Sequence, residues 1–519
     1  MSNPEHTKKA HQGGWKRGVL FTAIVLVLAF LAYYLMANVF RTPNLPRIGS
    51  SGAELPSTTL DIGVRAAPAS LDIHTEKGVA IEQALMGNVY EGLLRRNEKN
   101  TAEAGIATSW DVSKDALTYT FHLASGAHFS DGSELSAQDA VWSLQQTIEK
   151  KYVGADDLEK LASVRAPDDS TLIITVKSPD PELLWKLGGR AGLIFDQDAA
   201  DATTPLGSGP FTIGAWEKGK TLTLQRDDDY WAGTAAVKTA TLHYYSDTAA
   251  EVKALEAGTL QAAYGISAEQ MQTLKGKGFT TAAGDTTNVV VLGFNNDASS
   301  VLSDKRFRQA VRYMIDEPAI ISALGGLHAE QGGPLPSLDP GYEKLSDMFP
   351  VDPAKGRSLS YYFGAGYYHK LWVVTPDTID PTIAKMVVEQ LRAGGLVAEV
   401  KTIVADEWDT TVVQNHDFDL ALTLTSESHN LGLYADPSTS NPWTYSTSAG
   451  AEEYAKAQSA TTEADYEKYI KQTARTVSEE APADWLYQER IAVAWSAKVT
   501  GVSPNMADRR LPLAELKVS

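Results

Sequence analysis

The chain has 519 residues, no cysteine and a net charge of −19, with 43% apolar and 21% charged residues. At roughly 100–200 residues per domain, this length indicates about two to four domains, and the composition excludes wholesale disorder. The acidic charge argues against nucleic acid as a partner. The lack of cysteine excludes disulfides, thiolate zinc sites, Fe–S clusters and a lipidated N-terminal cysteine.

The N-terminal region contains a charge-free apolar segment at residues 18–40, preceded by Lys8, Lys9, Lys16 and Arg17. About 20 apolar residues cross a bilayer as a helix, and the basic flank indicates that residues 1–17 are cytoplasmic. The alternative is a cleaved signal peptide, which would have a shorter apolar region and a better cleavage site than Leu35-Met36-Ala37. We expect an uncleaved transmembrane signal anchor, and a single-pass membrane protein whose ectodomain lies outside the cytoplasm, at the bacterial cell surface or in the periplasm.

Residues 41–56 are rich in Pro, Gly and Ser and show no apolar periodicity, so they predict a short linker. Residues 1–41 carry five basic side chains and one acidic side chain, which leaves the remainder more acidic than the whole chain. Such a field favours cationic ligands. The alternative is that the charge serves solubility alone.

Strands and helices mix along the first half of the ectodomain. Apolar residues at helical spacing predict a helix over residues 80–94, and Ser136 with Asp139 forms a capping box that predicts a helix to about residue 149. Alternation and β-branched residues predict strands and one hairpin at residues 58–64, 117–123, 171–176, 211–215 and 221–225.

The pattern changes from about residue 288. Strands are expected at residues 289–294, 371–375, 397–404 and 418–424, and helices at 304–316, 379–393 and 407–414. This alternation is typical of βαβαβ units and predicts a partly parallel sheet.

No motif for catalysis or metal binding stands out. The chain has no His-Glu-x-x-His, no P-loop and no Gly-x-Ser-x-Gly, and its ten histidines are scattered. The acidic run at residues 227–229 is interpreted as a solvated turn. We therefore expect no catalytic residue, no metal site, no cofactor and no enzyme activity.

An ordered set of short segments resembles the family 5 extracellular solute-binding proteins, the peptide-binding receptors of ABC importers. Each motif is weak alone, but their order and spacing hold over nearly the whole ectodomain. The segments are Ser70-Leu71-Asp72-Ile73-His74, Val89-Tyr90-Glu91-Gly92-Leu93-Leu94, Ala107-Thr108-Ser109-Trp110, Tyr119-Thr120-Phe121-His122-Leu123, Phe129-Ser130-Asp131-Gly132, Pro205-Leu206-Gly207-Ser208-Gly209-Pro210-Phe211, Asp229-Tyr230-Trp231, Phe294-Asn295 and Asp304-Lys305-Arg306-Phe307-Arg308.

The resemblance implies an α/β, periplasmic-binding-protein-like fold of type II (Venus-flytrap), with two lobes that close on a ligand and an additional inserted domain, here joined to the N-terminal transmembrane helix. The two crossings between the lobes, near residues 288 and 484, would form the hinge. The implied division is lobe I from residues 57–87, 205–288 and 485–519, the inserted domain at 88–204 and lobe II at 289–484.

The resemblance also implies ligand contacts. The acid after the first motif is Glu76, and the tyrosine after Glu256-Ala257-Gly258-Thr259-Leu260 is Tyr264. Trp408, followed by Val412 and His416, precedes the last strand. The family often continues with Trp-x-x-Asp, whose acid binds a peptide's ammonium group, whereas this chain has Thr425, Ser426 and Glu427 followed by Ser428. The missing tryptophan leaves the pocket for the peptide N-terminus open to question.

The implied function is a membrane-tethered, monomeric receptor that captures a short peptide, with cationic ones favoured, or a similar small solute. It would deliver this ligand to ABC permease subunits that work with cytoplasmic ATPases. The alternative is a tethered sensor or surface interaction protein that keeps the fold without transport.

Overall fold

The computed structural model describes residues 58–198, 206–363, 369–426, 428–439, 441–445, 449–507 and 510–519. The expected cytoplasmic segment, anchor and linker at residues 1–56 lie outside this part of the chain. In the ranges that are described, no helix is long and apolar enough to cross a membrane. Residues Pro56–Ser519 form one compact unit.

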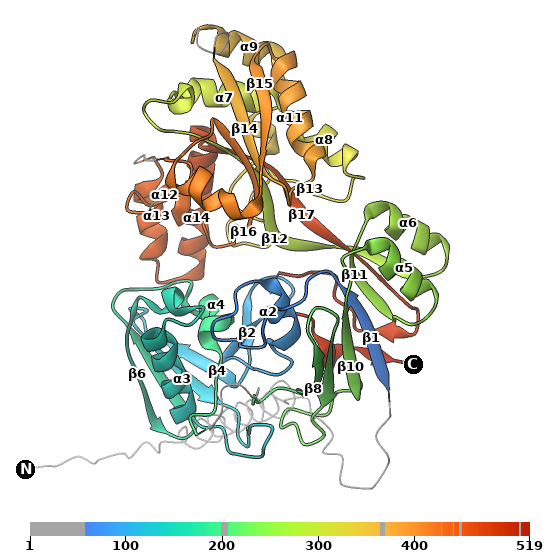
Figure 1. The fold of residues 1–519 in the computed structure, drawn as a ribbon. Coiled ribbons are helices and arrows are strands. Elements are labelled where there is room, and N and C mark those ends of the chain that lie inside the picture. The colour runs from blue at the N-terminus through green and yellow to red at the C-terminus, as the bar shows by residue number, and fades with distance from the viewer. Residues whose placement is uncertain are drawn as a thin grey trace, which may run out of the picture. The chain divides into compact units, whose positions relative to one another are not determined.

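One long sheet of 11 strands organises most of the chain (Figure 1). Its order is β15-β14-β16-β12-β17-β11-β1-β10-β9-β8, and β13 pairs with β17. The strands are β1 (Thr59–Val64), β8 (Phe211–Glu217), β9 (Thr221–Arg226), β10 (Thr239–Tyr244), β11 (Ala262–Ile266), β12 (Thr280–Phe294), β13 (Ala329–Glu330), β14 (Lys370–Pro376), β15 (Val397–Ile403), β16 (Leu420–Ser426) and β17 (Ala483–Trp495).

The longest strands, β12 and β17, lie side by side and antiparallel in the middle of this sheet, with 15 and 13 residues. At about 3.3 Å per residue they extend roughly 40–50 Å. β17 contributes to two hydrophobic cores, one on each side of its midpoint, whereas the apolar residues of β12 that join a core all follow its midpoint.

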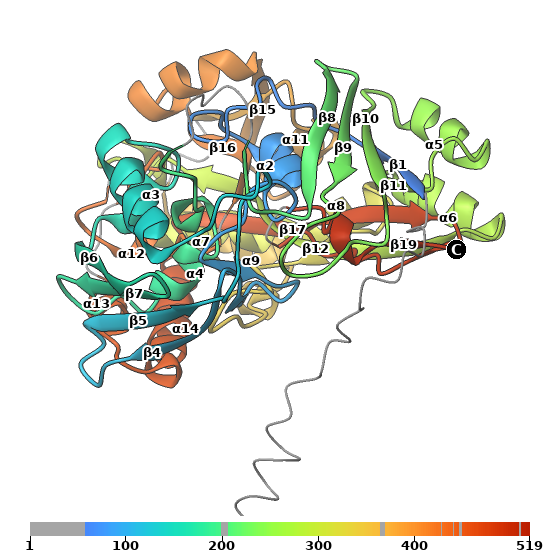
Figure 2. The same ribbon diagram turned by 90° about the horizontal axis from the view of Figure 1, so that it is seen from below.

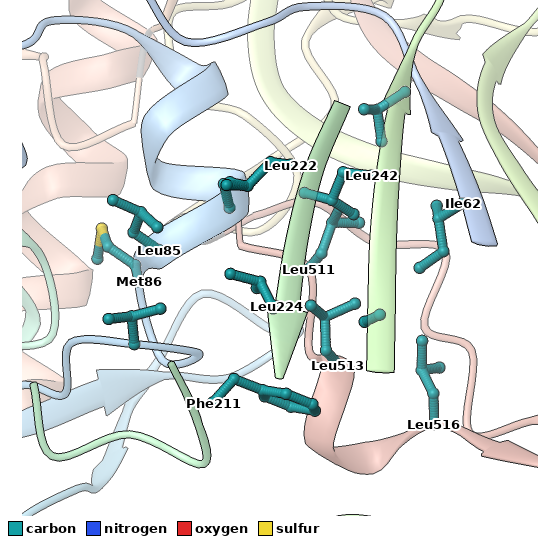
Figure 3. Close-up of a cluster of buried hydrophobic side chains, with 14 of the residues drawn as sticks. Ile62, Leu85, Met86, Phe211, Leu222, Leu224, Leu242, Leu511, Leu513 and Leu516 are labelled. Carbon is teal, nitrogen blue, oxygen red and sulfur yellow. The ribbon is translucent and has the colours of Figure 1, made fainter. Parts of the chain in front are cut away.

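The first core lies around the strands β1, β8, β9 and β10. Figure 3 shows Ile62 of β1, Leu224 of β9 and Leu242 of β10 close to Leu513 and Leu516 from the last residues of the chain. The helices at this end of the sheet are α2 (Val79–Leu85), α5 (Thr248–Glu256) and α6 (Ala268–Gly276), and a small ribbon of β18 (Val499–Thr500) and β19 (Lys517–Val518) follows β17.

The second core has two layers, because neighbouring residues of β12 face opposite sides of the sheet. Val290 and Leu292 pack with α7 and α11, whereas Val289 and Val291 pack with α14. The helices around these strands (Figure 1) are α7 (Lys305–Met314), α8 (Glu317–Ala323), α9 (Pro353–Tyr361), α11 (Pro381–Ala393), α12 (Gly432–Ala435), α13 (Ala451–Gln458) and α14 (Glu463–Glu480).

A separate sheet of four strands, in the order β4-β5-β7-β6, packs against α3 (Figure 2). The predicted capping box is confirmed, because Asp139 Oδ2 accepts the Ser136 backbone N–H at 2.8 Å where α3 begins. The elements of this region are β2 (Leu94–Arg96), β3 (Ala102–Ala104), β4 (Ala107–Val112), β5 (Thr118–Leu123), α3 (Ala137–Lys150), β6 (Leu161–Asp168), β7 (Thr171–Val176) and α4 (Leu183–Leu187).

The predicted partly parallel sheet is confirmed, with one of the two expected βαβ units built around an α-helix. β14 pairs in parallel with both β15 and β16, and α11 connects β14 to β15. The predicted hairpin of β8 and β9 is also present.

The prediction of one helix over residues 80–94 is wrong beyond Leu85, where α2 ends. Gly87 adopts a φ of 68°, and the Asn88 side-chain amide donates to the carbonyls of Ala84 (3.2 Å) and Leu511 (2.8 Å). Val89 is buried although it lies outside the helix. The apolar spacing therefore reflected burial against the C-terminal segment and not a continuous helix.

The prediction of an α-helix over residues 407–414 is also wrong. The segment is a 3₁₀ turn (Ala405–Glu407) followed by a π-helical turn (Asp409–Gln414). Its four consecutive β-branched residues, 410–413, resist regular helix because their side chains crowd the preceding turn.

Candidate ligand-binding cleft

A cavity of about 530 Å³, here called the central cavity, lies beside the midpoints of β12 and β17. Its walls come from both ends of the long sheet. Arg65 and Gly265 stand on the side of the first core, and Asp380 at the start of α11 stands on the side of the second core. The volume is in the range of sites for small molecules and short peptides.

The backbone of β12 explains why this wall is polar. The pairing with β17 is irregular between Asp285 and Val289, which leaves Thr286, Thr287 and Asn288 out of the regular ladder. Thr286 Oγ1 donates to the Glu489 carbonyl (2.8 Å), and Asn288 Nδ2 donates to Glu489 Oε2 (2.9 Å). These bonds hold a polar bulge directly before the apolar second half of the strand, residues 289–294.

A second cavity of about 310 Å³, here called the lateral cavity, is lined by three parts of the chain. Arg190 and Trp185 come from the region of the four-stranded sheet, Glu82 from α2, and Ser426 from the end of β16. Thr287 lines both cavities, so the two adjoin at the bulge of β12.

Charged groups in the central cavity are partly neutralised by partners. Arg490 Nε donates to Asp285 Oδ1 at 2.6 Å. His328 stacks on Tyr487 with ring centroids 4.6 Å apart, and its Nδ1 accepts the backbone N–H of Arg490 at 3.2 Å. Burial, with a contribution from the Arg490 charge, lowers the pKa of His328 to about 4. His328 is therefore neutral at physiological pH.

The lateral cavity carries two arginines that are anchored to the protein. Arg190 is 7% exposed, donates to the Glu76 carbonyl at 2.9 Å and lies 3.6 Å from Glu82. Arg96 lies over the Trp185 ring, 3.4 Å from its centroid. Burial raises the pKa of Asp157, which faces the same cavity. Anchored charges of both signs suit a ligand that carries both signs.

Ser426 is the predicted contact that lines a cavity. It lies in the lateral cavity, where its hydroxyl is 3.4 Å from that of Thr287. Thr425, its neighbour on β16, is half-buried, and Glu427 lies outside the described residues.

The other predicted contacts lie away from the walls of the two cavities in the described part of the chain. Tyr264 is 1% exposed within the first core, although the next residue, Gly265, lines the central cavity. The Glu76 carboxylate accepts the Ser70 hydroxyl at 3.2 Å, and its carbonyl holds Arg190.

The segment before β16 packs into the second core. Val412 is fully buried there, and Trp408 is half-buried against the same cluster. His416 has a φ of 51°, and its carbonyl accepts the Asn295 side-chain amide at 3.2 Å. The structure thus does not bring these three residues together with Ser426.

Sequence reasoning missed the residues that line both cavities from the strand midpoints and from the region of the four-stranded sheet. The one available signal was the polar run Thr286-Thr287-Asn288 directly before an apolar strand. Arg190 and Trp185 had no signal, because they reach the cleft only through the tertiary structure. Among the described residues, no group of three or more His, Asp or Glu is placed to hold a metal ion.

Comparisons with known proteins identify the family. The model of bacterial extracellular solute-binding proteins, family 5, matches residues 101–452. A Brucella ovis protein described as an ABC transporter peptide-binding protein is 31% identical over 267 residues, 49% of this chain and 50% of the relative, so the match spans about half of that relative's length. The glutathione-binding protein GsiB of Pectobacterium atrosepticum is 26% identical over 452 residues, 81% of this chain and 87% of the relative.

A solved structure shows the same fold at low sequence identity. The periplasmic binding protein DppA from Helicobacter pylori, in complex with the peptide STSA, superposes with a TM-score of 0.74 over 89% of this chain and 98% of DppA, at 19% identity. The chain therefore has the two-lobed, periplasmic-binding-protein-like α/β fold that its motifs implied. It belongs to the bacterial extracellular solute-binding proteins of family 5.

Proposed function

We propose that this protein captures a short peptide in the cleft formed by the central and lateral cavities and delivers it to an ABC importer. The observation that carries the proposal is the polar bulge of β12, where two adjoining cavities meet at Thr287. The name of the Brucella relative and the peptide in the Helicobacter complex support a peptide as the ligand. The family consists of binding proteins, so capture involves no bond making or breaking.

We also propose that two lobes meet at the midpoints of β12 and β17 and that these midpoints form the hinge. The division into lobe I (57–87, 205–288 and 485–519), inserted domain (88–204) and lobe II (289–484) accompanies this proposal. Closure around this hinge would enclose a peptide whose backbone is held by the polar bulge. Water would bridge its side chains to the walls at little cost in enthalpy, which permits varied sequences.

We further propose that residues 18–40 tether this receptor to the membrane, with residues 41–56 as the linker. The charge-free apolar run and its basic N-terminal flank support this proposal. The chain has no cysteine that could carry a lipid anchor, so an N-terminal transmembrane helix would hold the receptor at the membrane instead.

Native mass spectrometry of the purified full-length protein, before and after mild unfolding, tests the proposal. We expect release of a series of peptide masses. Ser426→Trp, which fills the lateral cavity, should abolish this series, whereas Ser163→Trp on the exposed face of β6 should retain it. A single non-peptide mass, or retention of peptides by Ser426→Trp, would contradict the proposed site or ligand.

A further inference from the structure

Buried polar contacts join the region of the four-stranded sheet to the second core, next to the lateral cavity. They form two groups that meet at the residues directly after β16. The first group comprises Asn100, Asp339 and Ser428, and the second comprises Glu182, His429 and Tyr466.

Asp339 is the centre of the first group and is 6% exposed. Its Oδ1 accepts the Ser428 hydroxyl (2.7 Å) and Asn100 Nδ2 (2.9 Å), and its Oδ2 accepts the His429 backbone N–H (2.7 Å). Asn100 Nδ2 also donates to Ser428 Oγ (2.8 Å), and Asn100 Oδ1 accepts Trp185 Nε1 (2.9 Å). One buried amide thus joins two regions that are 328 residues apart at Ser428.

Glu182 is the centre of the second group and is 8% exposed. It bonds His429 Nδ1 at 2.9 Å and accepts the Tyr466 hydroxyl. Trp185 stacks on the His429 ring with centroids 3.9 Å apart. These contacts reduce the pKa of Glu182 to about 2 in spite of its burial, because hydrogen bonds and the imidazole charge favour the carboxylate.

The backbone at this junction is in an uncommon conformation. His429 has a φ of 54°, in the left-handed region that few residues other than glycine adopt. Such a conformation persists only where surrounding contacts enforce it. Two hydrogen bonds hold His429 in this conformation. Asp339 accepts its backbone N–H, and Glu182 bonds its ring nitrogen.

The same segment lines the proposed ligand site. Ser426 and Ser428 both face the lateral cavity, as does Trp185 from the opposite side. Any movement that separates Asn100 and Glu182 from the second core would therefore release the conformation of Ser428 and His429.

We propose that Asp339 and Glu182 are positioning residues of an interlobe latch, which holds Ser428 and His429 in the conformation seen beside the lateral cavity only when the inserted region has closed on lobe II. The link between this latch and ligand contact rests on the proposed function, whereas the link between the latch and closure does not. Asn100, Trp185 and Tyr466 are the other members of the latch. Ligand contact and closure are then coupled, because the same hydrogen bonds join the inserted region to lobe II and hold the serines beside the lateral cavity.

The experiment uses Asn100→Ala, which removes the two hydrogen bonds of Asn100 to Asp339 and Ser428 and leaves the residues that line the lateral cavity unchanged. Asn97→Ala is the matched control, because Asn97 Oδ1 accepts only the local backbone N–H groups of Lys99 and Thr101 within the described chain. Both are compared with the wild type as full-length protein. The chain has no cysteine, so Ser163→Cys on β6 and Thr402→Cys on β15 place two spin labels specifically.

Two readouts are made. Double electron–electron resonance measures the distance between the labels, and titration with an equimolar pool of synthetic tri- and tetrapeptides measures affinity. We expect Asn100→Ala to move the distance distribution to longer values and to weaken peptide binding roughly ten- to hundredfold, with both properties unchanged in Asn97→Ala. Glu182→Gln should move both readouts in the same direction as Asn100→Ala.

Unchanged distances in both Asn100→Ala and Glu182→Gln would overturn the latch. Altered distances with unchanged peptide affinity would also overturn it, because Ser428 and His429 would then keep their conformation without closure. A wild-type protein that binds no peptide of the pool, yet opens on Asn100→Ala, would refute the proposed ligand and support the interlobe contacts as the closing device.

Discussion

At the scale of single residues, burial decides which acids are unusual in this protein. Glu251 on α5 is fully buried, and neither of its carboxylate oxygens has a hydrogen-bond partner in the described chain. Its neighbour Gly63 leaves the room it needs, since a Cβ there would lie 2.5 Å from Glu251 Oε1. Burial raises the pKa of Glu251 to about 7, against the opposing pull of Arg65, whose Nη1 lies 3.9 Å away.

This pKa predicts a dependence of stability on pH. Because the folded-state pKa exceeds the unfolded value of 4.5, stability is fully present below pH 4.5 and is lost as pH rises through about 7. Glu251→Gln keeps the shape and removes the ionisation. We expect the free energy of unfolding of the variant, relative to wild type, to rise by up to about 3 kcal/mol between pH 4.5 and 8, measured by urea unfolding.

The wild type contains a second acid of this kind, Glu91, whose burial raises its pKa to about 7. It is present in both proteins and cancels in the comparison. A difference between variant and wild type that does not change with pH would show that Glu251 does not titrate in this range.

Site residues were predictable where a motif fixed their place on a strand. Ser426 was expected from the resemblance, because it lies in the place of the family's Trp-x-x-Asp motif, just beyond a strand that the alternation predicts. Arg190 and Trp185 were not predicted, because they belong to the region of the four-stranded sheet, which only tertiary packing brings to the cleft. Whether Tyr264 and Trp408 contact a ligand stays a prediction.

At the scale of elements, β12 has two structural roles, one at its middle and one at its C-terminal end. Its polar middle faces the cavities, and its end lies against a large aromatic side chain. Gly293 is required there, because a Cβ at this position would lie 2.1 Å from Cε3 of Trp443, which is 1% exposed. The strand can pass the indole only without a side chain.

Gly293→Ala therefore tests the packing of this strand. Overpacking typically costs about 1–3 kcal/mol, and we expect a loss of that size in the free energy of unfolding, measured by denaturant titration. Gly276→Ala on α6 is the control, because a Cβ there meets no atom within 4 Å. It should be neutral or stabilise by up to about 1 kcal/mol. Equal stability of the two variants would contradict this role of Trp443.

Elements with strong periodicity could be predicted from the sequence. β14, α11, β15 and β16 were found in order, because each has a clear apolar pattern and a turn or cap at its end. The segment over residues 80–94 was not, because its apolar residues are buried by the C-terminal segment, whose position no local pattern reveals.

At the scale of the whole molecule, we propose that ligand binding takes place where the two halves of the long sheet meet. The order of strands that creates this place, with β17 between β12 and β11, joins residues about 200 apart and could not be read from periodicity. The fold was predicted instead from the ordered motifs that resemble the family. Because the remainder beyond residue 41 is strongly negative, we predict that cationic peptides bind more tightly than anionic ones of the same length.

The most direct test is hydrogen–deuterium exchange of the full-length protein with and without the pool of tri- and tetrapeptides. We expect increased protection at the bulge of β12 (residues 286–288), at the end of β16 (residues 424–426) and at the middle of β17 (residues 487–492). We also expect no change in the exposed strand β6. Peptide binding without protection at these three segments, or with protection confined to other surfaces, would contradict the proposed place of binding.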